Sequence, residues 1–368
     1  MTGIRADANS IIASGHVMRC ITIAGELAAM GEKVTFFVAD EESKALFDAF
    51  SGELPAAEAV VLGTDWRDME GEVPVLKEEL AKRDIHTLLV DSYQVTCAYF
   101  EKLSGVRGLA YMDDLGKEAY PVDMIINYSG YYKKLGYEEL YRGMNGRRGR
   151  EMRFLTGLMY APLRQQFRGA EGPVSAGDLA EHRNISILLT AGGGDTRGML
   201  MPTLCAAADR GLMGTLPDGT AITWQVVVGS MVANAEEIIS FAGCHEGIAV
   251  HRNVTDMAGL MKKCDLAIAA AGTMLTECAA LKLPTVFYQV ADNQKYNVEY
   301  WRSTGGMLFA GDVTGGEEDR RREVIFAIAD HVGELVKKRE MLIKMSTSLK
   351  GITDGRGAER IAKALLEL

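Results

Sequence analysis

Three short apolar runs in the first half of this chain each end on a polar residue, and this repetition limits the folds open to it. The runs span 87–90, 108–112 and 124–126, and the residues that follow them are Asp91, Asp113 with Asp114, and Asn127. Apolar runs of this length are typical of strands buried on both faces of a parallel sheet. Such sheets place ligand-facing residues at the carboxyl ends of their strands. The pattern therefore predicts an α/β domain with one functional edge.

The strand–helix alternation begins again in the second half of the chain. Further strands are predicted at 185–190, 224–228, 266–269 and 285–288, and residues 170–178 have the composition of a linker. A length of 368 residues suits two domains. We expect two doubly wound, Rossmann-like α/β domains facing each other across a cleft, with the division between about residues 157 and 183. An amphipathic helix is predicted at the end of the chain, over 357–368.

Charge and cysteine usage narrow the function classes. The net charge of −10 argues against a nucleic-acid partner. No apolar run is long enough for a membrane span, and residues 1–9 contain no secretory signal. The six cysteines are scattered without a C-x-x-C pair, which argues against a disulfide framework or a zinc ribbon. A cytoplasmic protein is expected.

The segment from Arg5 to His16 is the first candidate site. A short strand with Arg5 and Asp7 gives way to small residues and then to Gly15 and His16 just before a helix. Glycine permits close approach of a ligand, and a histidine side chain, which ordinarily titrates near pH 6.5, is suited to activating water. The alternative is a histidine packed at a helix start. Cys20 lies four residues after His16, but no third ligand is evident and no metal site is expected.

Two further segments follow strands in the second half. Gly192, Gly193 and Gly194 precede Asp195 and a predicted helix, an arrangement that cradles phosphate oxygens, although a plain tight turn is the alternative. At 270–277, small residues are followed one helical turn later by Glu277. A carboxylate there can accept hydrogen bonds from both hydroxyls of a ribose, or it can simply stabilise a helix N-terminus. The polar residues of 292–297 suit a sugar, or form an ordinary capped loop.

With these residues in place, the chain resembles a known family, the UDP-sugar hydrolases of pseudaminic acid biosynthesis, which act on a UDP-diacetamido-trideoxy-altrose. Spore-coat polysaccharide proteins are related to that family. The matching segments keep their order along nearly the whole chain and are Arg5 to Asp7, Gly15 to Arg19, 89–93, 112–114, Gly157, Tyr160, Leu163, Arg164, Gly192 to Asp195, Ala271 to Thr273, Glu277, Asp354, Gly355, Gly357, Arg360 and Ile361.

The resemblance extends to the N-acetylglucosaminyltransferase of peptidoglycan synthesis, which implies a GT-B fold. It implies that residues 1–165 form a domain with the catalytic base His16 and that residues 183–368 form a nucleotide-binding domain. Implied contacts on the sugar and phosphate side are Arg5, Asp7, Gly15, Asp91, Tyr93, Asp114, Asn293 and Gln294. Implied nucleotide contacts are Gly192, Gly193, Gly194, Asp195, Val254, Ala271, Gly272, Thr273, Met274 and Glu277.

The implied reaction needs neither a metal nor a cofactor. Water deprotonated by His16 attacks the anomeric carbon of a UDP-sugar, the configuration inverts, and UDP leaves. Either Asp7 or Asp91 would orient the imidazole. Ser92 and Thr276 differ from the residues of a family member, which leaves the sugar open. The alternatives are a GT-B glycosyltransferase with a UDP-sugar donor and a non-catalytic nucleotide-sugar-binding protein. A transferase of the lipid pathway would need a membrane-facing patch, for which Arg147, Arg148 and Arg150 are the candidates.

Overall fold

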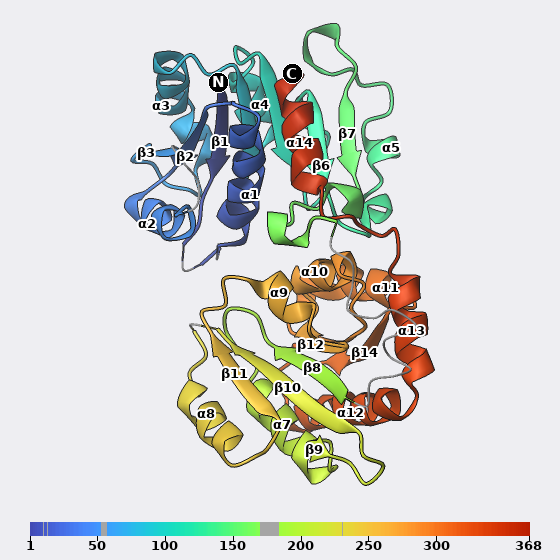
Figure 1. Cartoon of the computed structure of the whole chain (residues 1–368). Helices are drawn as coiled ribbons and strands as arrows, with labels where there is room; N and C mark the ends of the chain where they lie inside the picture. The colour runs from blue at the N-terminus through green and yellow to red at the C-terminus, as the bar shows by residue number, and fades with distance from the viewer. Residues whose placement is uncertain (10, 13, 53–56, 170–183, 230) are drawn as a thin grey trace. The chain divides into compact units, whose positions relative to one another are not determined.

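The computed structural model describes residues 1–9, 11–12, 14–52, 57–169, 184–229 and 231–368, which form two compact units (Figure 1). The first unit comprises Met1–Gln165 and Gly355–Leu368, and the second comprises Gln166–Asp354. The division after Gln165 lies within the predicted range. The predicted linker at 170–178 lies outside the described residues.

Seven parallel strands within the described part of the first unit form one sheet, in the order β3-β2-β1-β4-β5-β6-β7. The strands are β1 (Thr2–Ala6), β2 (Val34–Val38), β3 (Glu58–Val61), β4 (Thr87–Asp91), β5 (Gly108–Met112), β6 (Met124–Asn127) and β7 (Arg153–Thr156). The helices are α1 (Gly15–Ala29), α2 (Glu41–Phe50), α3 (Met69–Lys82), α4 (Cys97–Lys102), α5 (Tyr137–Leu140) and α14 (Gly357–Leu366).

The two faces of this sheet are covered by different helices. Alternating strand residues such as Leu89 and Ala110 pack with α1, α2 and α14 on one face. Their neighbours Leu88 and Leu109 pack with α3 and α4 on the other face. Burial on both faces explains why the strands are continuous apolar runs rather than alternating ones.

The C-terminal helix corrects one domain boundary. Residues 357–368 were predicted as an amphipathic helix, and α14 confirms the helix. The predicted second domain, however, ran to residue 368, whereas α14 packs against α1 and β4 of the first unit. The physical reason is its apolar face, because Ile361 and Leu365 are fully buried in the core shared with α1.

The second unit has its own sheet, in the order β11-β10-β8-β12-β13-β14, with β9 antiparallel to β10. The strands are β8 (Asn184–Thr190), β9 (Gly214–Thr215), β10 (Ala221–Val228), β11 (Ile248–Arg252), β12 (Leu266–Ala270), β13 (Thr285–Gln289) and β14 (Met307–Asp312). The helices are α7 (Leu200–Asp209), α8 (Ala235–Gly243), α9 (Met257–Met261), α10 (Met274–Ala280), α11 (Lys295–Ser303), α12 (Glu318–Lys337) and α13 (Arg339–Ser348). The prediction of two doubly wound sheets is confirmed.

Each sheet contains one point at which the strand order reverses. In the first unit it lies between β1 and β4, and in the second between β8 and β12. The connections that leave neighbouring strands at such a point run in opposite directions, which opens a crevice outside the carboxyl ends of the strands. We therefore expect the ligand-binding residues of each unit to lie near its reversal point.

Candidate active site

His16 and Asp91 lie at the reversal point of the first sheet. His16 is the second residue of α1, the helix that follows β1. Asp91 is the last residue of β4 and pairs in register with Ala6 of β1. Asp114 follows the adjacent strand β5, and Tyr128 follows β6. The structure therefore brings together the polar residues that the sequence placed after separate strands.

The His16 ring is held by Asp91. Its Nδ1 lies 2.6 Å from Asp91 Oδ1, and the two residues are 7% and 1% exposed. Burial alone would raise the pKa of Asp91, but the charges of Arg19 and His16 and their hydrogen bonds hold that pKa well below its ordinary value. An ionised carboxylate only accepts hydrogen bonds, so Nδ1 donates and the lone pair of the neutral imidazole is on Nε2. Asp91, rather than Asp7, thus orients the imidazole.

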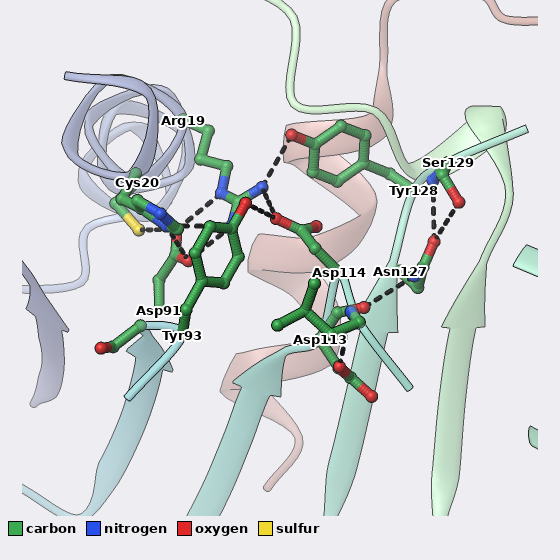
Figure 2. Close-up of polar contacts among 12 residues, drawn as sticks. Arg19, Cys20, Asp91, Tyr93, Asp113, Asp114, Asn127, Tyr128 and Ser129 are labelled. Carbon is green, nitrogen blue, oxygen red and sulfur yellow. Dashed lines mark hydrogen bonds and ion pairs between the residues drawn. The ribbon is translucent and has the colours of Figure 1, made fainter. Parts of the chain in front are cut away.

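Arg19 binds the same carboxylate through two nitrogens (Figure 2). Its Nε donates to Asp91 Oδ2 at 2.6 Å, and its Nη2 donates to Oδ1 at 2.5 Å. Its Nη1 donates to Asp114 Oδ2 at 2.8 Å and contacts the Tyr128 hydroxyl at 2.9 Å. One side chain of α1 is therefore tied to the ends of β4, β5 and β6.

Arg19 belonged to the motif that carried the resemblance but was not among the predicted site residues. A signal was present in its spacing. It lies three residues after His16, and side chains at that separation are neighbours on one face of a helix. Tyr128 carried no such signal, because nothing in the sequence shows that the residue after β6 reaches an arginine on α1.

Tyr93 forms one wall of a small pocket beside His16. The two rings meet edge to face, with centroids 4.5 Å apart and planes at 79°. The Tyr93 hydroxyl donates to Asp114 Oδ2 at 3.0 Å, although the residue as a whole is 41% exposed. The pocket is lined by Asp7, Ile12, His16, Trp66, Asp91, Ser92, Tyr93 and Gln94. Trp66 was not predicted, because the segment between β3 and α3 has no motif.

Gly15 begins α1 next to this pocket. A Cβ atom at this position would meet no atom within 4 Å. No packing in the described structure therefore requires glycine here, and the open space is compatible with the predicted approach of a ligand. That role stays a prediction.

The structure corrects the predicted role of Arg5, whereas a substrate contact by Asp7 stays a prediction. Arg5 is fully buried, and its guanidinium forms ion pairs of 2.6 Å with both Asp7 and Glu72. The other Asp7 oxygen accepts the main-chain N–H of Ala39 at 2.7 Å. β1 turns Arg5 toward α3, away from the face that carries α1, so this side chain serves the fold rather than a substrate. Asp7 still lines the pocket, but both of its oxygens are engaged internally.

The glycine-rich loop of the second unit follows β8, at the reversal point of that sheet. Gly192 has a φ of +77°, in the left-handed region that favours glycine. The loop after β10 approaches it closely, because a Cβ on Gly229 would lie 2.4 Å from the carbonyl oxygen of Gly193. Met231 lies against Gly193 and Gly194 and is 75% exposed.

Asp195 has a role that was not predicted. Its two carboxylate oxygens accept the main-chain N–H groups of Met199 and Leu200, each at 2.8 Å. These are donors that the first turn of a helix leaves without an intrahelical partner. Asp195 therefore caps α7, with both of its carboxylate oxygens engaged by main-chain N–H groups.

The loop after β12 lies beside the glycine-rich loop, because β8 and β12 are adjacent strands. Ala271 is fully buried and its carbonyl accepts the side-chain amide of Asn297 at 2.9 Å. Gly272 leaves open space where a Cβ would lie, and Thr273 is exposed. α10 then begins at Met274 and places Glu277, which is partly exposed, in its first turn.

The remaining predicted residues are on loops of the same unit. Asn293 is exposed, whereas Gln294 accepts the main-chain N–H of Val290 at 2.9 Å and so closes its own loop. Val254 is partly exposed between β11 and α9. Substrate contacts by Asn293 and Val254 stay predictions. The Gln294 carbonyl oxygen acts as the loop cap that was the alternative reading.

The described residues contain neither a cluster of three metal-ligating side chains nor a helix suited to span a membrane. Among them, no group of three His, Cys, Asp or Glu side chains is arranged to hold a metal ion. Cys20 is buried, and its thiol donates to Asp91 Oδ2 at 3.4 Å. None of the helices in the described segments is both long and apolar enough to cross a bilayer.

Similarity to solved structures identifies the fold of this chain. No protein-family model matches the chain. Over 183 residues it is 24% identical to the spore coat polysaccharide biosynthesis protein SpsG of Bacillus subtilis (strain 168), and the aligned part spans about half the length of each protein. This is a distant similarity.

Solved structures match over the whole length. MurG of Acinetobacter baumannii superposes with a TM-score of 0.67 at 11% identity, covering 100% of this chain and 99% of MurG. The UDP-GlcNAc 2-epimerase of Neisseria meningitidis, bound to UDP-GlcNAc, gives 0.56 at 12% identity and covers all of both chains. The spinosyn rhamnosyltransferase SpnG gives 0.59 at 13% identity, also over both whole chains. The chain has the GT-B fold.

Proposed function

We propose that this protein is a metal-independent hydrolase that cleaves a UDP-sugar into UDP and a free acetamido-deoxy sugar. The observation that carries the proposal is the buried His16–Asp91 pair beside a pocket at the carboxyl edge of the first sheet. A neutral imidazole oriented by a fixed carboxylate is suited to accept a proton from water. We propose that the first unit supplies this base and that the second unit binds the nucleotide.

The chemistry is an inverting displacement by water. The water oxygen attacks the anomeric carbon from the face opposite UDP, and Nε2 of His16 takes the proton. The bond between the anomeric carbon and the phosphate oxygen breaks, and its electron pair leaves with UDP. A positioned general base contributes on the order of 10²–10⁴-fold to such a step.

The loops after β8 and β12 supply the proposed nucleotide site. Main-chain N–H groups of the glycine-rich loop would bind the diphosphate and stabilise the leaving group. Glu277 would accept hydrogen bonds from the ribose hydroxyls, since it lies in the first turn of α10 at the reversal point of the second sheet. Support comes from the GT-B relatives, of which the epimerase was solved with UDP-GlcNAc bound.

The sequence resemblance supports the biological setting. SpsG is named for spore coat polysaccharide biosynthesis. We propose that the present protein likewise acts in the synthesis of a surface polysaccharide or of a nonulosonic acid such as pseudaminic acid, as an enzyme of the cytoplasm.

A glycosyltransferase is the second candidate, favoured by the likeness in fold to the rhamnosyltransferase. One observation weighs against a membrane-bound acceptor. Of the arginines expected to form a basic patch, Arg147 is partly buried and donates to the carbonyl of Val106 at 2.8 Å, and Arg150, although exposed, donates to that of Leu368 at 2.7 Å. Arg147 also pairs with Asp123 at 3.1 Å.

The experiment that separates the candidates is incubation with a panel of UDP-sugars in plain buffer without an acceptor. We expect UDP release from at least one acetamido sugar, and NMR of the first-formed sugar should show the inverted anomer. A transferase would release UDP only when an acceptor hydroxyl is added. Binding of UDP-sugars without release under either condition would indicate a non-catalytic protein.

A further inference from the structure

We propose that Arg19 is a positioning residue that fixes Asp91 and thereby keeps the His16 imidazole in the orientation in which Nε2 accepts the proton. The kinetic part of this inference rests on the proposed function, whereas its structural part does not. Arg19 itself touches no reacting atom in this account, since it acts through Asp91.

Four hydrogen bonds restrain the Asp91 carboxylate. Asp91 Oδ1 accepts from His16 Nδ1 and from Arg19 Nη2, and Oδ2 accepts from Arg19 Nε and from the Cys20 thiol. With both oxygens held by one planar guanidinium, the carboxylate cannot rotate about its Cβ–Cγ bond without breaking a charge-assisted hydrogen bond. A carboxylate fixed in this way presents one acceptor position to Nδ1.

The guanidinium is restrained in turn. Asp114 pairs with Nη1 at 2.8 Å, the Tyr128 hydroxyl lies 2.9 Å from the same nitrogen, and the arginine side chain is 10% exposed. Burial alone would lower the pKa of Arg19, but Asp114 and Asp91 raise it well above its ordinary value. Arg19 is therefore a permanent positive charge held from three strands. Lysine cannot replace this arrangement, because its ammonium is a single donor point rather than a planar fork.

Arg19 also lies close to the imidazole itself. Nη2 lies 3.2 Å from Nδ1, and both nitrogens converge on Oδ1. The other ionisable groups at the ring are Asp91 and Tyr93 from the β4 end and Asp7 from the β1 end, and Asp7 is paired with Arg5, which also pairs with Glu72. Loss of Arg19 would leave the Asp91 carboxylate without its two-point partner and free to rotate away from the acceptor position that it presents to Nδ1.

The test uses the full-length protein and compares Arg19→Gln with the wild type. Protein labelled with ¹⁵N in its histidine rings is studied by NMR at pH 8.5, with His16→Asn identifying the His16 signals. We expect the wild type to show the Nδ1–H form of the neutral ring, and Arg19→Gln to show a mixture of the two neutral tautomers. An unchanged Nδ1–H signal in the folded variant would overturn the proposal.

The kinetic readout uses the UDP-sugar that the wild type hydrolyses. Arg19→Gln should lower kcat roughly ten- to hundred-fold, the loss typical of a mispositioned catalytic group, while UDP affinity stays unchanged. A merely structural role would lower the fraction of folded protein but leave kcat per folded molecule and the His16 tautomer unchanged.

The two readouts separate the two proposals. If Arg19→Gln changes the His16 tautomer but neither protein hydrolyses any UDP-sugar, the positioning role stands and the proposed function fails. If Arg19→Gln does not fold, Arg19→Lys replaces it, because the positive charge is kept and only the fork is lost. Arg19→Lys should then lower kcat at least threefold and broaden the His16 signals. Wild-type kcat and signals in Arg19→Lys would overturn the proposal.

Discussion

Replacement of Asp91 by asparagine tests the electrostatic account of the site through stability, without a substrate. The variant keeps the shape of the side chain but removes its charge, and it turns an amide N–H₂ toward donors. Arg19 and His16 then lose the carboxylate that they share. Removing one partner of a buried ion pair typically costs about 3–5 kcal/mol. Arg19 retains Asp114, so we expect the lower end, about 3 kcal/mol at neutral pH.

The pH dependence of this stability difference follows from the direction in which folding shifts the pKa of Asp91. The pKa of Asp91 is lower in the folded protein than its ordinary value of about 3.9 in an unfolded chain. The carboxylate therefore contributes its full stabilisation above about pH 5, and this contribution is lost as the pH falls through the folded-state pKa. The difference in unfolding free energy between wild type and Asp91→Asn should shrink below about pH 4.

Urea unfolding followed by circular dichroism at pH 7, 5 and 3 measures this difference. Asp48→Asn is the matched control, because Asp48 is 54% exposed and pairs only at the surface with Lys44. The control should unfold at the same urea concentration as the wild type. An Asp91→Asn protein as stable as the wild type at pH 7, or an equal difference at pH 7 and pH 3, would refute the reasoning.

Three further experiments test two residues of the second unit and the expectation that the reaction needs no metal ion. Glu277→Ala should weaken UDP binding by about 1.5–3 kcal/mol, as the loss of a hydrogen bond to a charged group does, and unchanged affinity in calorimetry would contradict the ribose contact. Asp195→Ala should lower stability by about 1 kcal/mol because α7 loses its cap, with UDP affinity unchanged; lost affinity at unchanged stability would return Asp195 to the nucleotide site. EDTA should leave turnover unchanged, whereas loss of activity restored by a divalent metal would make metal-bound water the better hypothesis.

The central strands could be predicted from sequence because they are buried on both faces. β5 matches its predicted range, and β4 extends its predicted range by one residue. The strands that sequence missed lie toward the edges of the sheets. β3 and β11 contain exposed and partly exposed residues, and so they lack the continuous apolar run on which the prediction depended. The terminal helix was predicted, but the unit to which it belongs was not. An apolar face shows that a helix is buried, not which of two hydrophobic cores it packs into.

Site residues could be predicted from the sequence where they follow a strand. They could not be predicted where their role depends on a contact with a distant helix or strand. Asp91 and Asp114 were found because parallel strands bring their carboxyl ends to one edge. Arg5 was predicted to contact the substrate because a charged residue in a strand suggests a binding site. Its ion-pair partner, Glu72 on α3, is evident only from the fold. The cap made by Asp195 was not predicted, because a carboxylate after glycines suits a nucleotide as well as a helix cap.

The most direct test of the account is the turnover of His16→Asn measured beside its affinity for UDP. If His16 deprotonates the attacking water, kcat should fall by roughly two to four decades. UDP binding should stay nearly intact, because the nucleotide is proposed to bind the second unit. Full activity in His16→Asn would contradict the mechanism, and an equal loss of UDP affinity would contradict the assignment of base and nucleotide to separate units.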